Sequence, residues 1–85
     1  MENDSHFSTS DLGLAAFLLA SGLPFVGLRW QDHGRAEFIF EVAGYDLATL
    51  TARYFSGTGQ VPALSYKAAL DELKTRLHRE RRRGA

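Results

Sequence analysis

The chain has 85 residues, 45% of them hydrophobic and 24% charged, and this length accommodates one small domain with one hydrophobic core. Ten basic side chains balance ten acidic ones, which excludes a whole-molecule field that would attract nucleic acid or a membrane. The absence of cysteine excludes disulfides, thiolate zinc sites and a thiol nucleophile. Because a domain of this size is only marginally stable alone, we expect association with a second copy to complete its core.

Residues 1–8 are polar and acidic, and we expect them to be disordered or extended. They have no basic stretch in front of the apolar run at 12–20, so no signal peptide is predicted and the expected location is cytoplasmic. The run is far shorter than the roughly 20 residues that span a bilayer, so no membrane partner is expected. The remaining chain divides into a single domain over residues 9–78 and a basic C-terminal extension over residues 79–85.

A first helix is predicted over residues 10–21. The hydroxyls at 8–10 offer N-cap oxygens, Asp11 places a negative charge in the first turn, and Gly22 followed by Pro24 ends the helix. Apolar side chains lie on every face of this helix, whereas a surface helix needs only one apolar stripe. A chain of this size hardly surrounds a helix, so Leu14 and Leu18 are candidate interface residues in a homodimer.

Two strands are predicted over residues 25–31 and 36–42, joined by a polar turn into an antiparallel hairpin. One register places the large apolar side chains on the same face: it pairs Trp30 with Phe38, Leu28 with Phe40 and Val26 with Val42. A lone hairpin is marginal in water and has unpaired edges, so we expect a second copy to extend the sheet or cover it.

The opposite face of the hairpin is mostly polar. Phe25 and Ile39 are its exposed apolar residues, and they are candidates for a protein interface. Glu37 and Glu41 lie on this face of one strand, an arrangement that could perform acid–base chemistry. Because Arg29 lies nearby across the ladder, a cross-strand ion pair is the favoured interpretation.

A second helix is predicted over residues 45–56, with Gly57 just beyond its end and a flexible loop over residues 56–60. Successive helical residues point about 100° apart, so Tyr54 and Phe55 cannot share one stripe. One of the two is therefore a candidate for exposure, where it could stack on a base or pack against another surface.

A third helix is predicted to begin at the N-cap Ser65, with Leu64 packing onto Ala69. Glu72 and Arg76 have the spacing of a favourable ion pair along one helix. The apolar stripe of this helix consists of Tyr66, Ala69, Leu70, Leu73 and Leu77. After residue 77 the stripe fades, so residues 79–85 form either a solvated helical extension or a frayed tail.

Motifs for catalysis and for metal binding are absent from the sequence. His6, His33 and His78 lie in three different elements and lack the spacing of metal ligands. Ser56 is not in a nucleophile elbow, and the loop at 57–60 lacks the lysine and the preceding strand of a phosphate-binding loop. We therefore expect no enzyme, no cofactor and no metal.

Together these elements predict an α+β fold ordered helix, two-stranded antiparallel hairpin, helix, helix. The helices are expected to cover the apolar face of the hairpin. We expect symmetric dimerisation, through strand edges or through the apolar first helix, to extend the sheet or complete the core.

Charge is unevenly distributed along the chain. Residues 1–64 have seven acids against three bases, whereas residues 65–85 have seven bases against three acids. The candidate nucleic-acid-binding residues are Lys67, Lys74, Arg76, Arg79, Arg81, Arg82 and Arg83. The alternative is that these cations only favour a helix C-terminus and keep the chain end solvated.

Several stretches resemble an uncharacterised family of short bacterial and bacteriophage proteins, a domain of unknown function. They are Thr9-Ser10-Asp11-Leu12, Leu14-Ala15-Ala16-Phe17-Leu18, Ala36-Glu37-Phe38-Ile39-Phe40, Tyr54-Phe55 and Val61-Pro62-Ala63-Leu64. The resemblance covers roughly residues 7–78 and implies a prokaryotic or mobile-element setting. It implies no activity and no catalytic residues, and the arginines at 81–83 lie outside it.

The leading hypothesis for function is a small non-enzymatic accessory protein that binds DNA or RNA through the third helix and the arginine-rich end. The alternative is a protein-interaction module, such as a phage-type inhibitor or adaptor that binds a nucleic-acid-processing protein.

Overall fold

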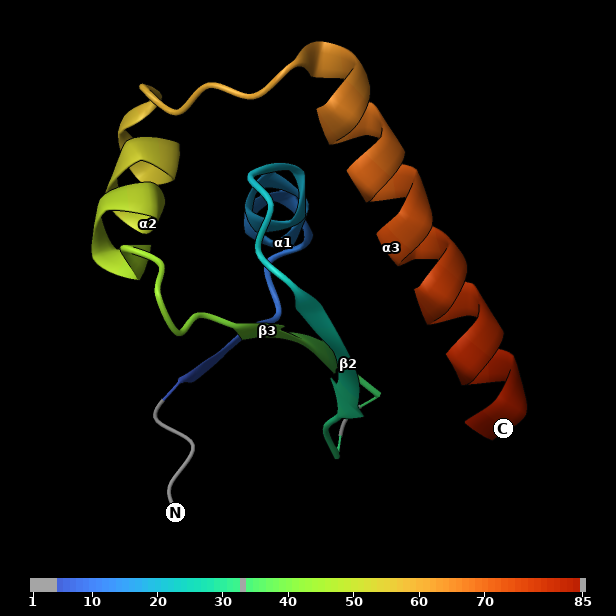
Figure 1. Cartoon of the computed structure of the whole chain (residues 1–85). Coiled ribbons are helices and arrows are strands. Elements are labelled where there is room, and N and C mark those ends of the chain that lie inside the picture. The colour runs from blue at the N-terminus through green and yellow to red at the C-terminus, as the bar shows by residue number, and fades with distance from the viewer. Residues whose placement is uncertain (1–4, 33, 85) are drawn as a thin grey trace.

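The structure is a computed structural model that describes residues 5–32 and 34–84, with side chains described up to Arg81. Its elements in chain order are β1 (His6–Thr9), α1 (Leu12–Ala20), β2 (Phe25–Trp30), β3 (Ala36–Glu41), α2 (Leu47–Ser56) and α3 (Ala63–Gly84). The helix α1 lies over the sheet between α2 and α3 (Figure 1). The predicted α+β class is therefore confirmed.

The sheet has three strands in the order β1-β3-β2, all antiparallel, where the sequence predicted a hairpin of two. Strand β1 pairs with β3, with Phe7 opposite Phe40 and Thr9 opposite Phe38. The chain's own N-terminal segment therefore occupies the outer edge of β3. The sequence missed this strand because four residues with one large apolar side chain give almost no periodicity, and the pairing partner lies about thirty residues away.

The predicted register of the hairpin is wrong by two residues. Trp30 lies opposite Ala36 and Leu28 opposite Phe38, so both still face the core side, because side chains alternate with a period of two. A bulge between Phe25 and Gly27 then inserts one extra residue into β2.

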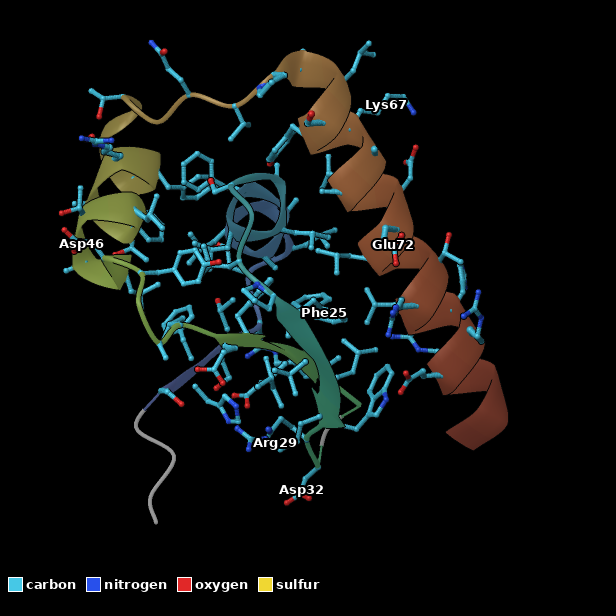
Figure 2. The ribbon with its side chains drawn as sticks, in the orientation of Figure 1. Phe25, Arg29, Asp32, Asp46, Lys67 and Glu72 are labelled. Atoms are coloured by element: carbon cyan, nitrogen blue, oxygen red, sulfur yellow. The ribbon has the colours of Figure 1, made fainter. Side chains whose placement is uncertain are left out.

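The bulge exchanges the roles that the sequence assigned to Phe25 and Val26. Phe25 turns to the core side, where its ring meets that of Phe40 edge-on with centroids 5.4 Å apart. Val26, predicted for the core face, is 52% exposed. The predicted exposure of Phe25 is therefore wrong as well, and Figure 2 shows its ring between β2 and α3.

The core lies between α1, the sheet and α3. Phe38 and Phe40 of β3 and Leu73 of α3 pack around the buried residues 14–18 of α1. Leu14 is 4% exposed and Leu18 is fully buried, within a single chain. The expectation that a partner must cover α1 is therefore wrong, because α2, α3 and the sheet surround it.

Local signals placed the helix ends to within about three residues. Asp11, predicted for the first turn, is instead the N-cap of α1 in place of the hydroxyls at 8–10, and its carboxylate accepts the Leu14 N–H at 3.1 Å. Gly57 ends α2 in the left-handed conformation at φ 81°, as predicted. The N-cap of α2 is Asp46, and the Thr49 hydroxyl and N–H that donate to its carboxylate hold the pKa of Asp46 below its usual value.

Helix α3 begins at Ala63, directly after Pro62 and before the predicted N-cap Ser65. Leu64 consequently lies in the first turn, 81% exposed, and does not pack onto Ala69 as predicted. The predicted apolar stripe is confirmed, because all five of its residues belong to the core or pack against it. The helix continues to Gly84, so the basic segment is helical throughout its described part. None of the described helices is long and apolar enough to cross a membrane.

Candidate functional site

The basic side chains of α3 lie on two flanks of the helix. Lys67, Lys74 and Arg81 recur every seven residues along one flank, and Arg76 and Arg79 lie on the opposite flank. The apolar stripe that packs against α1 separates the two flanks on the inner side. The five predicted cations whose side chains the structure describes therefore do not form a single stripe.

Two of these cations are paired within α3. The ammonium of Lys67 lies 2.9 Å from the Asp71 carboxylate, and this contact raises the pKa of Lys67 and lowers that of Asp71. Arg76 lies 3.6 Å from Glu72, which confirms the pair expected from the sequence. The guanidinium of Arg76 also lies over the ring of Phe25, 5.1 Å from its centroid. Lys67 and Arg76 are therefore partly neutralised before any ligand arrives.

The C-terminal half of α3 has the least compensated charge. Between residues 74 and 83 the sequence has six bases and one acid, Glu80. Among the residues that the structure describes, Lys74 and Arg79 are exposed and have no carboxylate within 4.0 Å. The side chains of Arg82 and Arg83 lie outside the described part of the chain.

This half of α3 is held to the sheet by few contacts. The guanidinium of Arg81 lies over the Trp30 ring, 5.7 Å from its centroid, and Leu77 is the last residue of α3 packed against the core. In Figure 1 the red end of α3 runs past β2 and ends away from the other elements. Arg79 therefore lies beyond the last core contact of α3, whereas Lys74 lies on the exposed side of its packed part.

The sheet face that the helices leave open is charged. Arg29 donates to Glu37 across the ladder at 2.8 Å, which confirms the predicted cross-strand ion pair, and His6 lies 3.1 Å from Glu41. The Ala43 N–H, and after it the Ser5 side chain, hold the pKa of Glu41 below its usual value. Both carboxylates thus have partners, which argues for a structural role.

The interface candidates from the sequence have different positions in the structure. Ile39 is half-buried on the open sheet face, opposite Ser8 and Gly27. Leu14, Leu18 and Phe25 contribute to the core or pack against it and offer little surface to a partner. Among the described side chains, the exposed large apolar residues are Val26, Tyr45, Phe55 and Leu64.

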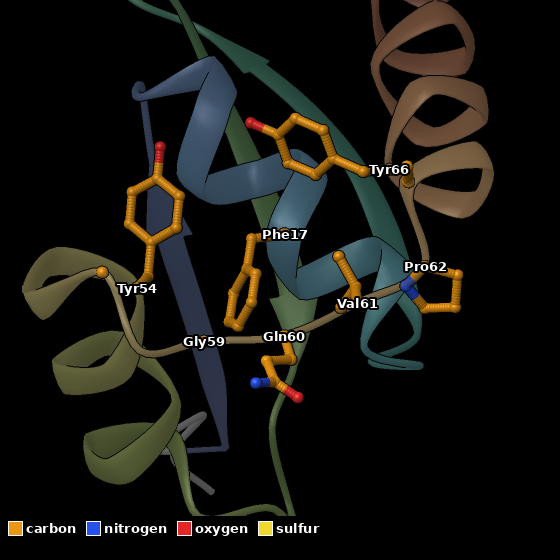
Figure 3. A pocket seen from close by; sticks show the side chains of 9 residues that line it. Phe17, Tyr54, Gly59, Gln60, Val61, Pro62 and Tyr66 are labelled. Atoms are coloured by element: carbon orange, nitrogen blue, oxygen red, sulfur yellow. The ribbon is translucent and has the colours of Figure 1, made fainter.

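An open hollow of about 840 Å³ lies between α1, the end of α2 and the start of α3 (Figure 3). Its lining consists of Phe17, Tyr54, Gly57, Gly59, Gln60, Val61, Pro62, Ala63 and Tyr66. Sequence reasoning missed this site and treated the loop as a flexible connector. The available signal was the pair Tyr54 and Phe55, of which Phe55 is 68% exposed while the Tyr54 ring meets Phe17 at 5.4 Å.

The described residues contain no group of three metal-ligating side chains that could hold an ion. No family model matches the chain, and comparison with curated proteins and with solved structures found no significant similarity.

Proposed function

We propose that the protein binds DNA or RNA through the C-terminal half of α3, by contacts to backbone phosphates and without strong sequence preference. The observation that supports this most is the exposure of Lys74, Arg79 and Arg81 along the C-terminal half of α3. Each phosphate neutralised by such a cation releases a condensed counterion, which gives sequence-independent affinity.

The distribution of these cations on two flanks suits a nucleic-acid groove. An α-helix fits into the major groove of B-form DNA, where phosphate backbones line both sides. Cations on opposite flanks of α3 could then reach both backbones, whereas a single stripe would reach only one. The acidic remainder of the chain, seven acids against three bases over residues 1–64, would turn away from the duplex.

The first prediction concerns the salt dependence of binding. The full chain, titrated into fluorescently labelled duplex and single-stranded oligonucleotides, should lose affinity steeply between about 50 and 200 mM salt. The double variant Lys74→Gln/Arg79→Gln should lower the slope of log Kd against log salt by about 2, because each lost phosphate contact contributes about 0.9.

The matched control is Lys67→Gln/Asp71→Asn, which removes one charge of each sign from an existing ion pair on the same helix. It should leave the affinity unchanged within about twofold, since such a pair offers little to a phosphate. Absence of binding at about 50 mM salt, or an equal effect of the two double variants, would contradict the proposal.

A second candidate function is a protein-interaction module. It is supported by Phe55 and Leu64, which are 68% and 81% exposed and follow the lining residues Tyr54 and Ala63 in the sequence. Aromatic residues of this kind often anchor protein interfaces. A partner captured from a prokaryotic extract by the natural chain, and lost with Phe55→Ser and Leu64→Ser while nuclease treatment has no effect, would favour this function over nucleic-acid binding.

A further inference from the structure

Three aromatic rings from three different helices converge on the hollow. Figure 3 shows Tyr54 of α2 on one side, Tyr66 of α3 on the other and Phe17 of α1 between them. The rings of Phe17 and Tyr54 are 5.4 Å apart at an angle of 42°. Segment 59–62 crosses from α2 to α3 and closes one side of the hollow.

Close packing against glycine fixes two of these rings. A Cβ at Gly59 would lie 2.7 Å from the Phe17 ring, so only glycine lets the loop cross at this distance. A Cβ at Gly13 would collide with the Tyr54 hydroxyl. The Tyr66 hydroxyl donates to the Gly13 carbonyl at 3.4 Å, so both tyrosines reach the same turn of α1. The hollow therefore has its aromatic walls in place before a ligand binds.

The electrostatic environment of the hollow favours a cation. No lysine or arginine is among its lining residues. The carboxylate of Asp11, which accepts the Leu14 N–H, lies beside the same turn of α1 as the two hydroxyls. Burial raises the pKa of Tyr54, and the neighbouring Tyr66 and Asp11 raise it further, as expected where additional negative charge is disfavoured. The C-terminal end of α2 and the N-terminal end of α3 both line the hollow, and their opposite dipole ends offset each other.

We propose that this hollow binds a methylated ammonium group, held by the rings of Phe17, Tyr54 and Tyr66 and attracted by the Asp11 carboxylate. Aromatic faces attract such cations, whose apolar substituents also tolerate the loss of water. An unmethylated ammonium is more strongly hydrated and would bind less well, because the hollow offers rings in place of several hydrogen-bond acceptors. The lining is mostly apolar, and its polar side-chain groups are the amide of Gln60 and the hydroxyls of the two tyrosines.

The test is a titration of the full chain with choline chloride at constant ionic strength, followed through the NMR signals of the aromatic side chains. Signals of Phe17, Tyr54 and Tyr66 should shift together and saturate. The neutral isostere 3,3-dimethylbutanol has the same shape without the charge, and it should bind at least about tenfold more weakly, since cation–π attraction is lost.

Two variants separate the charge from the rings. Asp11→Asn keeps a good N-cap and removes the carboxylate charge, so choline affinity should fall about threefold while that of the isostere stays constant. Tyr66→Leu should lower choline affinity about fivefold, whereas Tyr66→Phe, which keeps the ring, should retain most of it. If Tyr66→Leu fails to fold, Asp11→Asn and the isostere comparison still decide the question.

A trimethyllysine peptide and its unmodified counterpart identify the source of the group. Tighter binding of the modified peptide than of choline would indicate a methylated protein, and the reverse order a small metabolite. Equal binding of choline and its isostere, shifts scattered over the surface, or no effect of Asp11→Asn would overturn the proposal. None of these outcomes depends on α3 binding nucleic acid, because the hollow lies at the opposite end of that helix.

Discussion

Gly59 shows at the scale of one residue how closely the chain is packed around the aromatic hollow. Its missing side chain lets the α2–α3 loop lie directly on the Phe17 ring. From the sequence alone this glycine suggests only flexibility, because nothing local distinguishes a flexible connector from a point of close approach. The contact becomes visible only when α1 is placed beneath the loop.

We predict that Gly59→Ala destabilises the fold by about 1–3 kcal/mol, because the added methyl overlaps the Phe17 ring and either the loop or the ring must move. Urea unfolding measures this loss. Phe17→Leu alone also costs stability, but the double variant should cost less than the sum of the two, since the smaller side chain makes room for the methyl. Strict additivity would show that the two sites do not touch.

At the scale of an element, the bulge in β2 decides which of two neighbouring side chains supports the core. Phe25 lies between the Phe40 ring and the Arg76 guanidinium, while Val26 faces solvent. The alternating pattern of a strand allows either Phe25 or Val26 to face the core. The bulged strand, in which Phe25 faces the core, is more stable because Phe25 makes the larger apolar contact with β3 and α3.

We therefore expect Phe25→Ala to lower the free energy of unfolding by about 2–4 kcal/mol and Val26→Thr to change it by less than about 0.5 kcal/mol. Chemical denaturation followed by Trp30 fluorescence measures both. The unbulged register predicted from the sequence requires the opposite ranking, so a larger loss for Val26→Thr would contradict the observed strand.

At the scale of the whole molecule, the question is where the chain could associate with a second copy. The stretch of α1 that the sequence offered as an interface is enclosed by the chain's own elements, and β1 occupies the outer edge of β3. The outer edge of β2 forms the other side of the sheet, beside the exposed Val26. Self-association stays a proposal, and this edge is the surface to test for it.

We expect sedimentation velocity to show a weak dimer that forms with increasing concentration and is dispersed by Val26→Lys, because a lysine on an edge strand opposes pairing with another chain. Phe55→Lys is the matched control, an exposed apolar residue on a different element, and it should leave the dimer unchanged. A monomer up to a concentration of about 1 mM would contradict self-association through this edge.

The sequence by itself determined the features that depend on neighbours within a few residues. The glycine at the end of α2, the apolar stripe of α3, its Glu72–Arg76 pair and the alternation that sets the inner face of β3 are confirmed. These features depend on backbone conformation or helical spacing, which the local sequence controls directly. The uneven distribution of charge, on which the proposed nucleic-acid interface depends, is likewise evident from the sequence.

Tertiary structure alone decided the third strand, the bulge and the aromatic hollow. The pairing of β1 with β3 joins segments about thirty residues apart, and its free energy comes from long-range contacts that no local pattern records. The hollow needs α1, α2 and α3 together, because Phe17, Tyr54 and Tyr66 are far apart in the sequence and meet only through packing. The same packing buried Leu14 and Leu18 within one chain, because a nine-residue helix is short enough for the chain's own sheet and helices to surround.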